Sequence, residues 1–315
     1  MPRGARRTAA TLVGLFLAAL LAFGLWPEAP AGPTGGWLKA AGLEPRFETV
    51  AGLRVRYVRA GEGPPVVLLH GFASSLYTWK DVLPALAGTR TAVALDFPGF
   101  GQSDQPPDLS ADVYPGLVLG LMDRLGLGPV ALVGNSMGGA VATLVAGRSP
   151  ERVSALVLVD AAGFNLGESD RPWILRLANT APGGAVFERL PVRRRMVRLS
   201  LRQVFHDPAL VTEERFDEYL APLQRPGATA SILSLLASRA GDPGQVAAAA
   251  ARVSVPTLVI WGKQDRWIPV EHADRFLSAI PGARKVVLDP CGHLPQEERP
   301  GDVVPLLREF LGGEE

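Results

Sequence analysis

Cysteine is almost absent from this chain, since Cys291 is the single one among 315 residues. One thiol cannot form an internal disulfide, a cysteine-built zinc site or an iron–sulfur cluster, so these scaffolds are excluded. An excess of either charge sign is missing too, because the formal net charge at pH 7 is +1. This balance gives no overall electrostatic case for a nucleic-acid partner. Charged residues make up 20% of the chain against 47% hydrophobic residues, which excludes a disordered protein.

The chain has ample length and hydrophobicity instead. At roughly 150 residues per domain, its length suggests about two domains. The mean hydropathy of +0.17 is positive, which is unusual for a soluble enzyme. Much of this hydrophobicity lies in the uncharged run Thr8–Pro27, which follows Arg3, Arg6 and Arg7.

The apolar part of this run, Ala9–Trp26, is 18 residues long. It is at the lower edge of what spans a bilayer and longer than a typical signal-peptide core. We therefore predict a signal anchor at residues 1–27, with a cleaved signal peptide and a buried core helix as alternatives. Because the flanking arginines are expected to stay cytoplasmic, we expect an extracytoplasmic catalytic domain, membrane-anchored or, after cleavage, secreted. Residues 28–42 are rich in Pro, Gly and Ala and are predicted to be a linker.

Short apolar runs alternate with helical patterns along the rest of the chain. Two alternating runs predict a β-hairpin, Phe47–Val50 and Leu53–Val58. Continuous apolar runs predict strands that are covered on both faces, at Val66–Leu69, Thr91–Leu95, Val130–Val133, Val153–Val159, Pro256–Trp261 and Lys285–Leu288. Helical patterns occur at Leu76–Leu86, Ala111–Leu125, Met137–Arg148, Val270–Ile280 and Gly301–Leu311. This alternation predicts an α/β fold with a mostly parallel central sheet and helices on both faces.

One interval breaks the alternation. Residues 162–252 contain no convincing strand pattern, only helical segments rich in Leu, Ala and Arg. Because this interval lies between two predicted sheet strands, we predict that it is a helical cap inserted into a core made of residues 43–161 and 253–315. The two domains are then nested rather than arranged in tandem.

A G-x-S-x-G motif, Gly134-Asn135-Ser136-Met137-Gly138, lies between a predicted buried strand and a predicted helix. This context is typical of a nucleophile elbow, a sharp turn that exposes the serine oxygen above the sheet. Glycine is needed on both sides of the turn because larger side chains would clash there. The helix N-terminus favours negative charge beside the serine. The motif therefore predicts Ser136 as a nucleophile.

A serine nucleophile needs a base, and the chain has four histidines. Only His293 lies on a loop after the last predicted strand, which places it at the carboxyl edge of the sheet with Ser136. A carboxylate must orient its ring and stabilise the imidazolium. Asp265 and Asp160 both follow predicted strands at this edge; we favour Asp265 and assign Asp160 a structural role at the entry to the cap.

The segment His70-Gly71-Phe72 follows the first predicted parallel strand, in the position that supplies half of an oxyanion hole. The backbone N–H groups of Phe72 and Met137 are expected to stabilise the developing alkoxide. His70 is expected to hold this loop through hydrogen bonds rather than to transfer protons.

From about Phe47 to Leu311 the chain resembles the α/β-hydrolase superfamily. The order of the proposed catalytic residues along the chain, Ser, Asp, His, is that of the superfamily. Serine where epoxide hydrolases and haloalkane dehalogenases carry aspartate argues against both of those activities. The segments that carry the resemblance are His70-Gly71, Asp96–Ser103, the Ser136 elbow, Trp261–Asp265 and Gly292-His293.

Two branches of the superfamily share further features with this chain. The segments around Ser136, Asp265 and His293 resemble the carbon–carbon bond hydrolases of aromatic ring-fission products. Those enzymes usually have Gly-Pro-Gly after the His-Gly pair and Trp after the catalytic His, where this chain has Phe72-Ala73-Ser74 and Leu294. They are generally cytoplasmic, whereas membrane-anchored esterases and monoacylglycerol-lipase-like enzymes often carry an N-terminal apolar helix.

We therefore predict a serine esterase or lipase-like enzyme that acts on a small-molecule or lipid ester and contacts the membrane through its N-terminal helix. Its acyl-enzyme mechanism needs neither a metal nor a cofactor. Carbon–carbon bond hydrolysis is the alternative activity, and a non-catalytic ligand-binding protein is the alternative from another class. The side chains expected to line an apolar acyl pocket are Phe72, Trp79, Phe100, Met137, Phe164 and Trp267.

Overall fold

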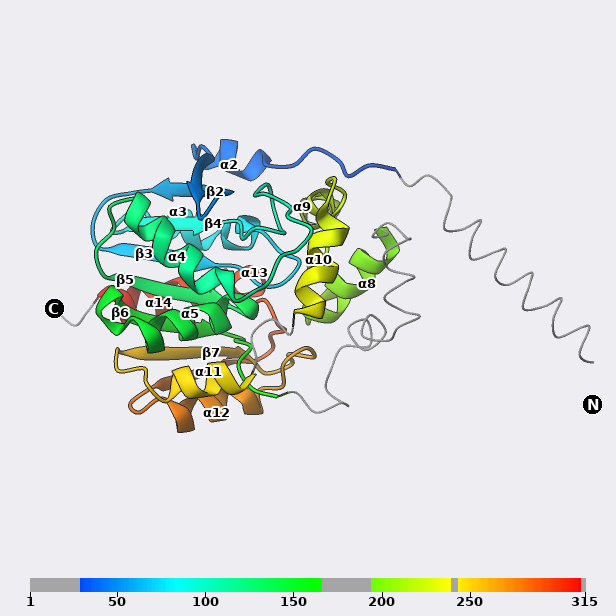
Figure 1. The fold of residues 1–315 in the computed structure, drawn as a ribbon. Helices are drawn as coiled ribbons and strands as arrows, with labels where there is room; N and C mark the ends of the chain where they lie inside the picture. Colours follow the sequence, from blue (N-terminus) through cyan, green and yellow to red (C-terminus); the bar gives the residue numbers. More distant parts are fainter. Residues whose placement is uncertain (1–28, 166–193, 239–242, 313–315) are drawn as a thin grey trace, which may run out of the picture.

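An eight-stranded sheet forms the centre of the protein (Figure 1). The computed structural model describes residues 29–165, 194–238 and 243–312. The strand order is β1-β2-β4-β3-β5-β6-β7-β8. β2 runs antiparallel to both of its neighbours, and all other neighbouring strands are parallel, which confirms the predicted sheet. The strands are β1 (Arg46–Val50), β2 (Leu53–Ala60), β3 (Pro65–Leu69), β4 (Thr91–Leu95), β5 (Val130–Asn135), β6 (Val153–Val159), β7 (Thr257–Gly262) and β8 (Arg284–Leu288).

Helices cover both faces of the sheet, which is why its central strands are apolar along their whole length. Alternate residues of one strand enter different cores: Val67 and Leu69 of β3 face one side, while Val66 and Leu68 face the other. The first core packs against α4 (Val113–Arg124), α5 (Met137–Arg148) and α12 (Glu271–Ala279). The second packs against α3 (Val82–Leu86) and α14 (Pro300–Gly312).

Two predicted segments differ from the structure. The helix expected at Leu76–Leu86 is split into η1 (Leu76–Trp79) and α3, because Pro84 has no N–H for an intrahelical hydrogen bond and is tolerated only in a first turn. The expected linker 28–42 contains a short helix, α2 (Gly36–Ala40), whose Leu38 is buried in the second core. A short helix that was not predicted, α13 (Pro295–Glu298), follows the loop of His293.

The described part of the expected cap is helical and lies at one end of the sheet (Figure 1). It consists of α8 (Arg194–Val204), α9 (Glu213–Leu223) and α10 (Ala228–Ala237), with the short turn η3 (Pro208–Leu210). The last helix of the interval, α11 (Pro243–Ala250), instead packs against α5 of the core through Val246 and Ala249. The structure therefore groups α11 with the core, earlier in the chain than the predicted boundary at residue 252.

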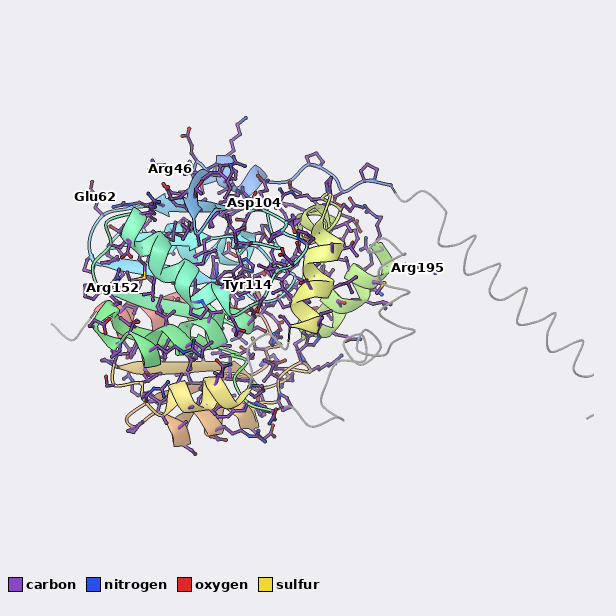
Figure 2. All side chains as sticks on the ribbon, viewed as in Figure 1. Arg46, Glu62, Asp104, Tyr114, Arg152 and Arg195 are labelled. Atoms are coloured by element: carbon purple, nitrogen blue, oxygen red, sulfur yellow. The ribbon has the colours of Figure 1, made fainter. Side chains whose placement is uncertain are left out.

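Charged side chains such as Arg46 and Glu62 project from the surface, whereas Tyr114 of α4 is buried (Figure 2). None of the helices within the described ranges combines the length and the apolar character of a membrane span. The N-terminal segment 1–27, for which an anchor or a signal peptide is predicted, lies outside those ranges.

Candidate active site

Ser136 occupies the turn between β5 and α5 in a conformation that L-residues rarely adopt, with φ 53° and ψ −119°. The turn is sharp because the neighbouring backbones approach closely. A Cβ on Gly134 would lie 2.4 Å from the Gly138 carbonyl oxygen, and one on Gly138 would lie 2.2 Å from the Leu69 carbonyl oxygen. Both glycines are therefore required, as the motif predicts, and the turn holds Ser136 beyond the end of the sheet.

Hydrogen bonds join the serine turn to the neighbouring strand end and to the histidine loop. The Ser136 N–H donates to the Val159 carbonyl at 3.1 Å. The Asn135 side-chain amide donates to the same carbonyl at 3.1 Å and to the His293 carbonyl at 3.2 Å. Asn135 thus connects Ser136 and His293, a role that the sequence did not reveal.

His293 and Asp265 form a buried hydrogen-bonded pair. The distance between His293 Nδ1 and Asp265 Oδ2 is 2.7 Å, and the two side chains are 4% and 0% exposed. The other oxygen of Asp265 accepts hydrogen bonds from the N–H groups of Trp267 and Ile268 at 2.7 and 3.0 Å. Because the carboxylate accepts at Nδ1, that nitrogen carries the proton and Nε2 is left as the basic nitrogen of the ring.

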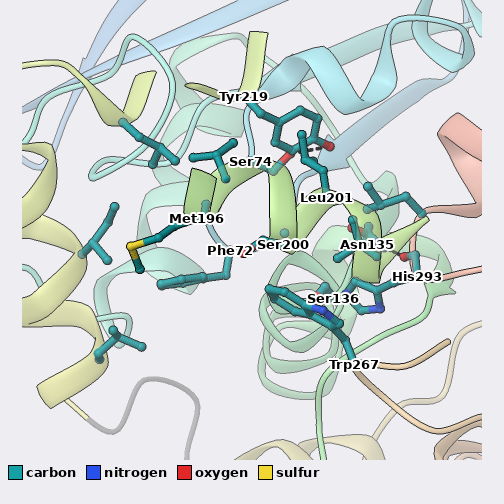
Figure 3. A pocket seen from close by; sticks show the side chains of 18 of the residues that line it. Phe72, Ser74, Asn135, Ser136, Met196, Ser200, Leu201, Tyr219, Trp267 and His293 are labelled. Carbon is teal, nitrogen blue, oxygen red and sulfur yellow. Dashed lines mark hydrogen bonds between the residues drawn. The ribbon is translucent and has the colours of Figure 1, made fainter. Parts of the chain in front are cut away.

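Ser136 and His293 line the same pocket, which has a volume of about 160 Å³. Figure 3 shows Ser136, His293 and Trp267 together on one side of it and Met196 across from them. The Trp267 ring stacks on the His293 ring with centroids 5.8 Å apart. The chain topology therefore brings the predicted serine, histidine and aspartate to one edge of the sheet.

The lining of the pocket is mostly apolar and comes largely from the cap. α8 and α10 supply most of the apolar side chains, and α9 supplies Tyr219 and Leu223. Sequence reasoning missed these cap residues, although the amphipathic pattern of α8 was a signal that one of its faces is buried. The lining residues of the three cap helices are Met196, Val197, Ser200, Leu201, Val204, Tyr219, Leu223, Thr229, Ile232, Leu233 and Leu236.

Two of the predicted aromatic pocket residues, Phe72 and Trp267, line the cavity. The structure places the other three aromatic residues outside it, and Met137, which was also expected to line it, is not among the lining residues. Trp79 is fully buried in the second core, beneath the sheet. Phe100 is 1% exposed and lies behind Phe72, at a ring-centroid distance of 5.4 Å. Phe164 packs edge-on against Phe276 at 4.8 Å, in a separate hollow beside α12.

The loop after β3 is fixed by the His70 ring, as the sequence predicts. His70 Nδ1 donates to the Gly71 carbonyl at 2.7 Å, and Nε2 accepts from the Phe97 N–H at 2.9 Å. Full burial lowers the pKa of His70, so the ring is neutral and can play both roles. The Gly71 carbonyl and the Phe72 N–H belong to one peptide plane, so the hydrogen bond from His70 to the carbonyl also sets the direction of the Phe72 N–H.

Met137 carries the second N–H group expected in the oxyanion hole. It is the first residue of α5, so its N–H is one of the four at a helix start that have no intrahelical partner. The Ser136 carbonyl, just before it, accepts from Gly139, Ala140 and Ala162. The peptide plane that carries the Met137 N–H is therefore held from its carbonyl side.

Asp160, Asp265 and His293 are the one group within the described ranges with ligand atoms close enough for a metal, all within 4.8 Å of one another. The 2.7 Å between His293 Nδ1 and Asp265 Oδ2 is, however, a hydrogen-bond length. Two ligands of a tetrahedral ion, each about 2.1 Å from it, lie roughly 3.4 Å apart. The residues present therefore fit a histidine–carboxylate hydrogen bond better than a metal shell.

Comparison with known proteins agrees with this geometry. Residues 64–300 match the family model for the alpha/beta hydrolase fold. The chain is 35% identical to the dihydrolipoyllysine-residue acetyltransferase component of the acetoin cleaving system of Cupriavidus necator, over 91% of this chain and 73% of that protein. It is 32% identical to a 2-hydroxymuconate semialdehyde hydrolase of Pseudomonas sp. (strain CF600), over 83% of this chain and 91% of that protein.

A solved structure described as a membrane phospholipase A, a bacterial protein, is also similar. It superposes with a TM-score of 0.74 at 26% identity, covering 97% of this chain and 98% of that chain. The relatives thus include proteins that are named for different bonds and substrates.

Proposed function

Because the chain belongs to the alpha/beta hydrolase fold family, we propose that it is a serine hydrolase that cleaves carboxylic esters. Its proposed catalytic residues are Ser136, His293 and Asp265, and its oxyanion hole consists of the N–H groups of Phe72 and Met137. The observation that carries the proposal is the buried 2.7 Å bond from His293 to Asp265, beside a pocket that Ser136 and His293 share.

In this mechanism His293 Nε2 accepts the proton of Ser136 Oγ while the oxygen attacks the acyl carbon. The Phe72 and Met137 N–H groups bind the negative oxygen, and Asp265 stabilises the imidazolium. The tetrahedral intermediate collapses, and the alcohol leaves with the proton from His293. His293 then deprotonates a water, which attacks the acyl-enzyme and releases the acid, and the proton returns to Ser136.

The charge of the pocket favours an uncharged ester. Among the described residues that line it, none is Lys or Arg. A ring-fission dienoate carries a carboxylate, which would lose its hydration in this apolar pocket without gaining a cationic partner. Carbon–carbon bond hydrolysis remains the second candidate because of the likeness to the 2-hydroxymuconate semialdehyde hydrolase.

We further propose that the enzyme is membrane-anchored through residues 1–27, with the catalytic domain outside the cytoplasm, and that its substrates are lipid esters. The chain that follows the proposed anchor runs along the cap. The Ala31 N–H donates to Gln224 Oε1 at 2.9 Å, and the Gly35 N–H donates to Glu218 of α9. An anchor before these residues would hold the cap, which lines the acyl pocket, close to the lipid surface.

The test uses the full-length enzyme with p-nitrophenyl esters of graded acyl length and a fluorophosphonate probe. We expect ester cleavage and labelling of one serine, both abolished in Ser136→Ala. Ser278→Ala, which removes an exposed hydroxyl bonded to the Asp274 carbonyl, is the matched control and retains both. Failure to cleave any ester, with turnover of a ring-fission dienoate, would replace this proposal by the second candidate. Carbonate extraction of cell membranes tests the anchor. Release of the enzyme from the membranes would refute it.

A further inference from the structure

Asp160 is a buried acid at the site for which the mechanism has no role. It follows β6 directly and has a φ of 44°, an unusual value for a residue with a side chain. Its side chain is inaccessible to solvent. Backbone contacts hold it there, since its N–H donates to the Ile260 carbonyl at 3.0 Å.

One oxygen of Asp160 is satisfied and the other is not. Oδ1 accepts a hydrogen bond from the Gly262 N–H at 3.0 Å. Oδ2 is buried without any donor among the described residues. The carboxyl group instead lies within hydrogen-bonding reach of the Asp265 carboxyl. Two carboxylates offer only acceptors, so a hydrogen bond between them requires a proton on one.

Among the residues that the structure describes, no cation forms an ion pair with Asp160. The negative charges of Asp265, on the loop after β7, and of Glu298 of α13 both raise the pKa of Asp160. His293 lies within 4.8 Å, and the Cys291 thiol is on the same loop. The charge of Arg299 affects the Cys291 thiol, but the Arg299 side chain forms its ion pair with Asp302, at 2.7 Å, and not with Asp160.

We propose that Asp160 is a positioning residue that holds a proton at neutral pH, and that its O–H donates a hydrogen bond to the Asp265 carboxylate. This inference rests on the proposed function of Asp265 as partner of His293. Asp265 then receives four donors: Asp160 O–H, the His293 ring and the Trp267 and Ile268 N–H groups. Asp265 keeps the negative charge because three of these donors are already directed at it.

The proton on Asp160 also limits the negative charge beside the His293 ring. With Asp160 neutral, a single negative charge faces the imidazole. A second anion within 4.8 Å would favour the imidazolium and leave less of the free base at neutral pH. Burial and the neighbouring Asp265 raise the pKa of Asp160 well above its usual range, in agreement with this protonation state.

The kinetic test compares the pH dependence of kcat/KM for the full-length wild type, Asp160→Asn and Asp160→Ala. Asn is neutral and keeps a donor, so we expect its acid limb to superimpose on that of the wild type and its kcat to stay within about threefold. Ala lacks the donor, and we expect kcat to fall about 10–100-fold at unchanged KM. A shift of the acid limb of Asp160→Asn to lower pH would mean that Asp160 is ionised and would overturn the proposal.

An infrared measurement tests the same proton without any substrate. The difference spectrum of wild type minus Asp160→Asn at neutral pH is expected to contain the C=O band of a protonated carboxylic acid. Asp289→Asn is the matched control, because Lys263 lowers the pKa of that exposed carboxyl and it contributes carboxylate bands alone. Absence of the protonated band refutes the proposal for Asp160 even if the enzyme cleaves esters, and its presence supports it even if the enzyme does not.

Discussion

The carboxyl edge of the sheet, which carries the proposed catalytic residues, and the cap above it are held by different kinds of bond. At the edge, backbone–backbone hydrogen bonds join neighbouring strand ends: the Ser136 N–H donates to the Val159 carbonyl at 3.1 Å, and the Asp160 N–H donates to the Ile260 carbonyl at 3.0 Å. The cap is held to the core mainly through side chains. Arg225 donates to the carbonyls of Gly101 and Ser103 at 2.7 and 2.8 Å.

A buried polar cluster makes another of these cap contacts. Arg215 of α9 lies 3.1 Å from the Glu297 carboxylate of α13, and the two side chains are 9% and 0% exposed. Tyr219 and Thr78 donate to the same carboxylate. Main-chain hydrogen bonds therefore place the serine turn at the edge, whereas the cap that lines the pocket is held by side chains that substitution can change.

The largest effect is expected at the edge. Asp265→Asn gives the ring a neutral partner and can favour the wrong tautomer, so we expect kcat to fall about 10³–10⁴-fold. The free energy of unfolding should change less than the activation free energy, because Asn keeps an oxygen that can still accept from the Trp267 and Ile268 N–H groups. Steady-state kinetics and chemical denaturation measure the two effects. Asp302→Asn, which changes an exposed ion pair, is the control. An equal loss of kcat in this variant would contradict the special role of Asp265.

Removing the buried cap pair tests the other side of the comparison. Arg215→Met leaves Glu297 buried without its cation, and we expect the free energy of unfolding to fall by about 3–5 kcal/mol. The double variant Arg215→Met/Glu297→Gln should recover part of this loss. As a control, Lys263→Met breaks a pair whose side chains are 57% and 47% exposed, and it should cost about 0–1 kcal/mol. Denaturant titration distinguishes these outcomes, and equal losses in both single variants would contradict the prediction.

Asp160 is the exception at the edge, a side chain kept at a cost to stability. The unfolded carboxyl ionises above its ordinary pKa of 3.8, whereas the folded pKa is well above that value. Below 3.8 both states hold the proton. As pH rises above 3.8 the wild type loses up to about 1.4 kcal/mol per unit, until pH reaches the folded pKa. Asp160→Asn has no such loss, so its Tm advantage over the wild type should grow with pH; a constant difference would be inconsistent with a raised folded pKa.

The smallest effect is expected inside the pocket. Met196 of α8 lies across the pocket from Ser136 (Figure 3). Met196→Trp fills this space, so we expect kcat/KM for long acyl esters to fall about tenfold while acetate esters are cleaved as before. Leu199→Trp, on the exposed face of the same helix at 49% exposure, is the control. An equal loss for short and long esters in Met196→Trp would indicate damage to the edge rather than to the pocket.

Local patterns sufficed for the sheet and the nucleophile. Thr91–Leu95 and Val153–Val159 are apolar along their length and became β4 and β6 with the predicted ends. Gly134 and Gly138 predicted the turn at Ser136, because a Cβ at either position would clash with neighbouring backbone atoms. The positions of the aromatic residues were harder to predict. Trp267 lines the pocket, whereas Trp79 lies in the core on the other face of the sheet. An aromatic side chain fits a buried core and an apolar pocket equally well, so its neighbours in the sequence do not distinguish the two environments.

The sequence by itself determined the α/β alternation, the serine turn and which loops reach the carboxyl edge, because each follows from local periodicity or from glycine stereochemistry. Tertiary structure alone decided which cap side chains line the pocket, that α11 packs on the core, and that Asp160 and Asp265 face each other. These contacts join residues on separate strands and helices, and their energies depend on burial and on the distance between groups. Local sequence encodes neither quantity, so the positions of the proposed catalytic residues could be predicted from the sequence, whereas their surroundings could not.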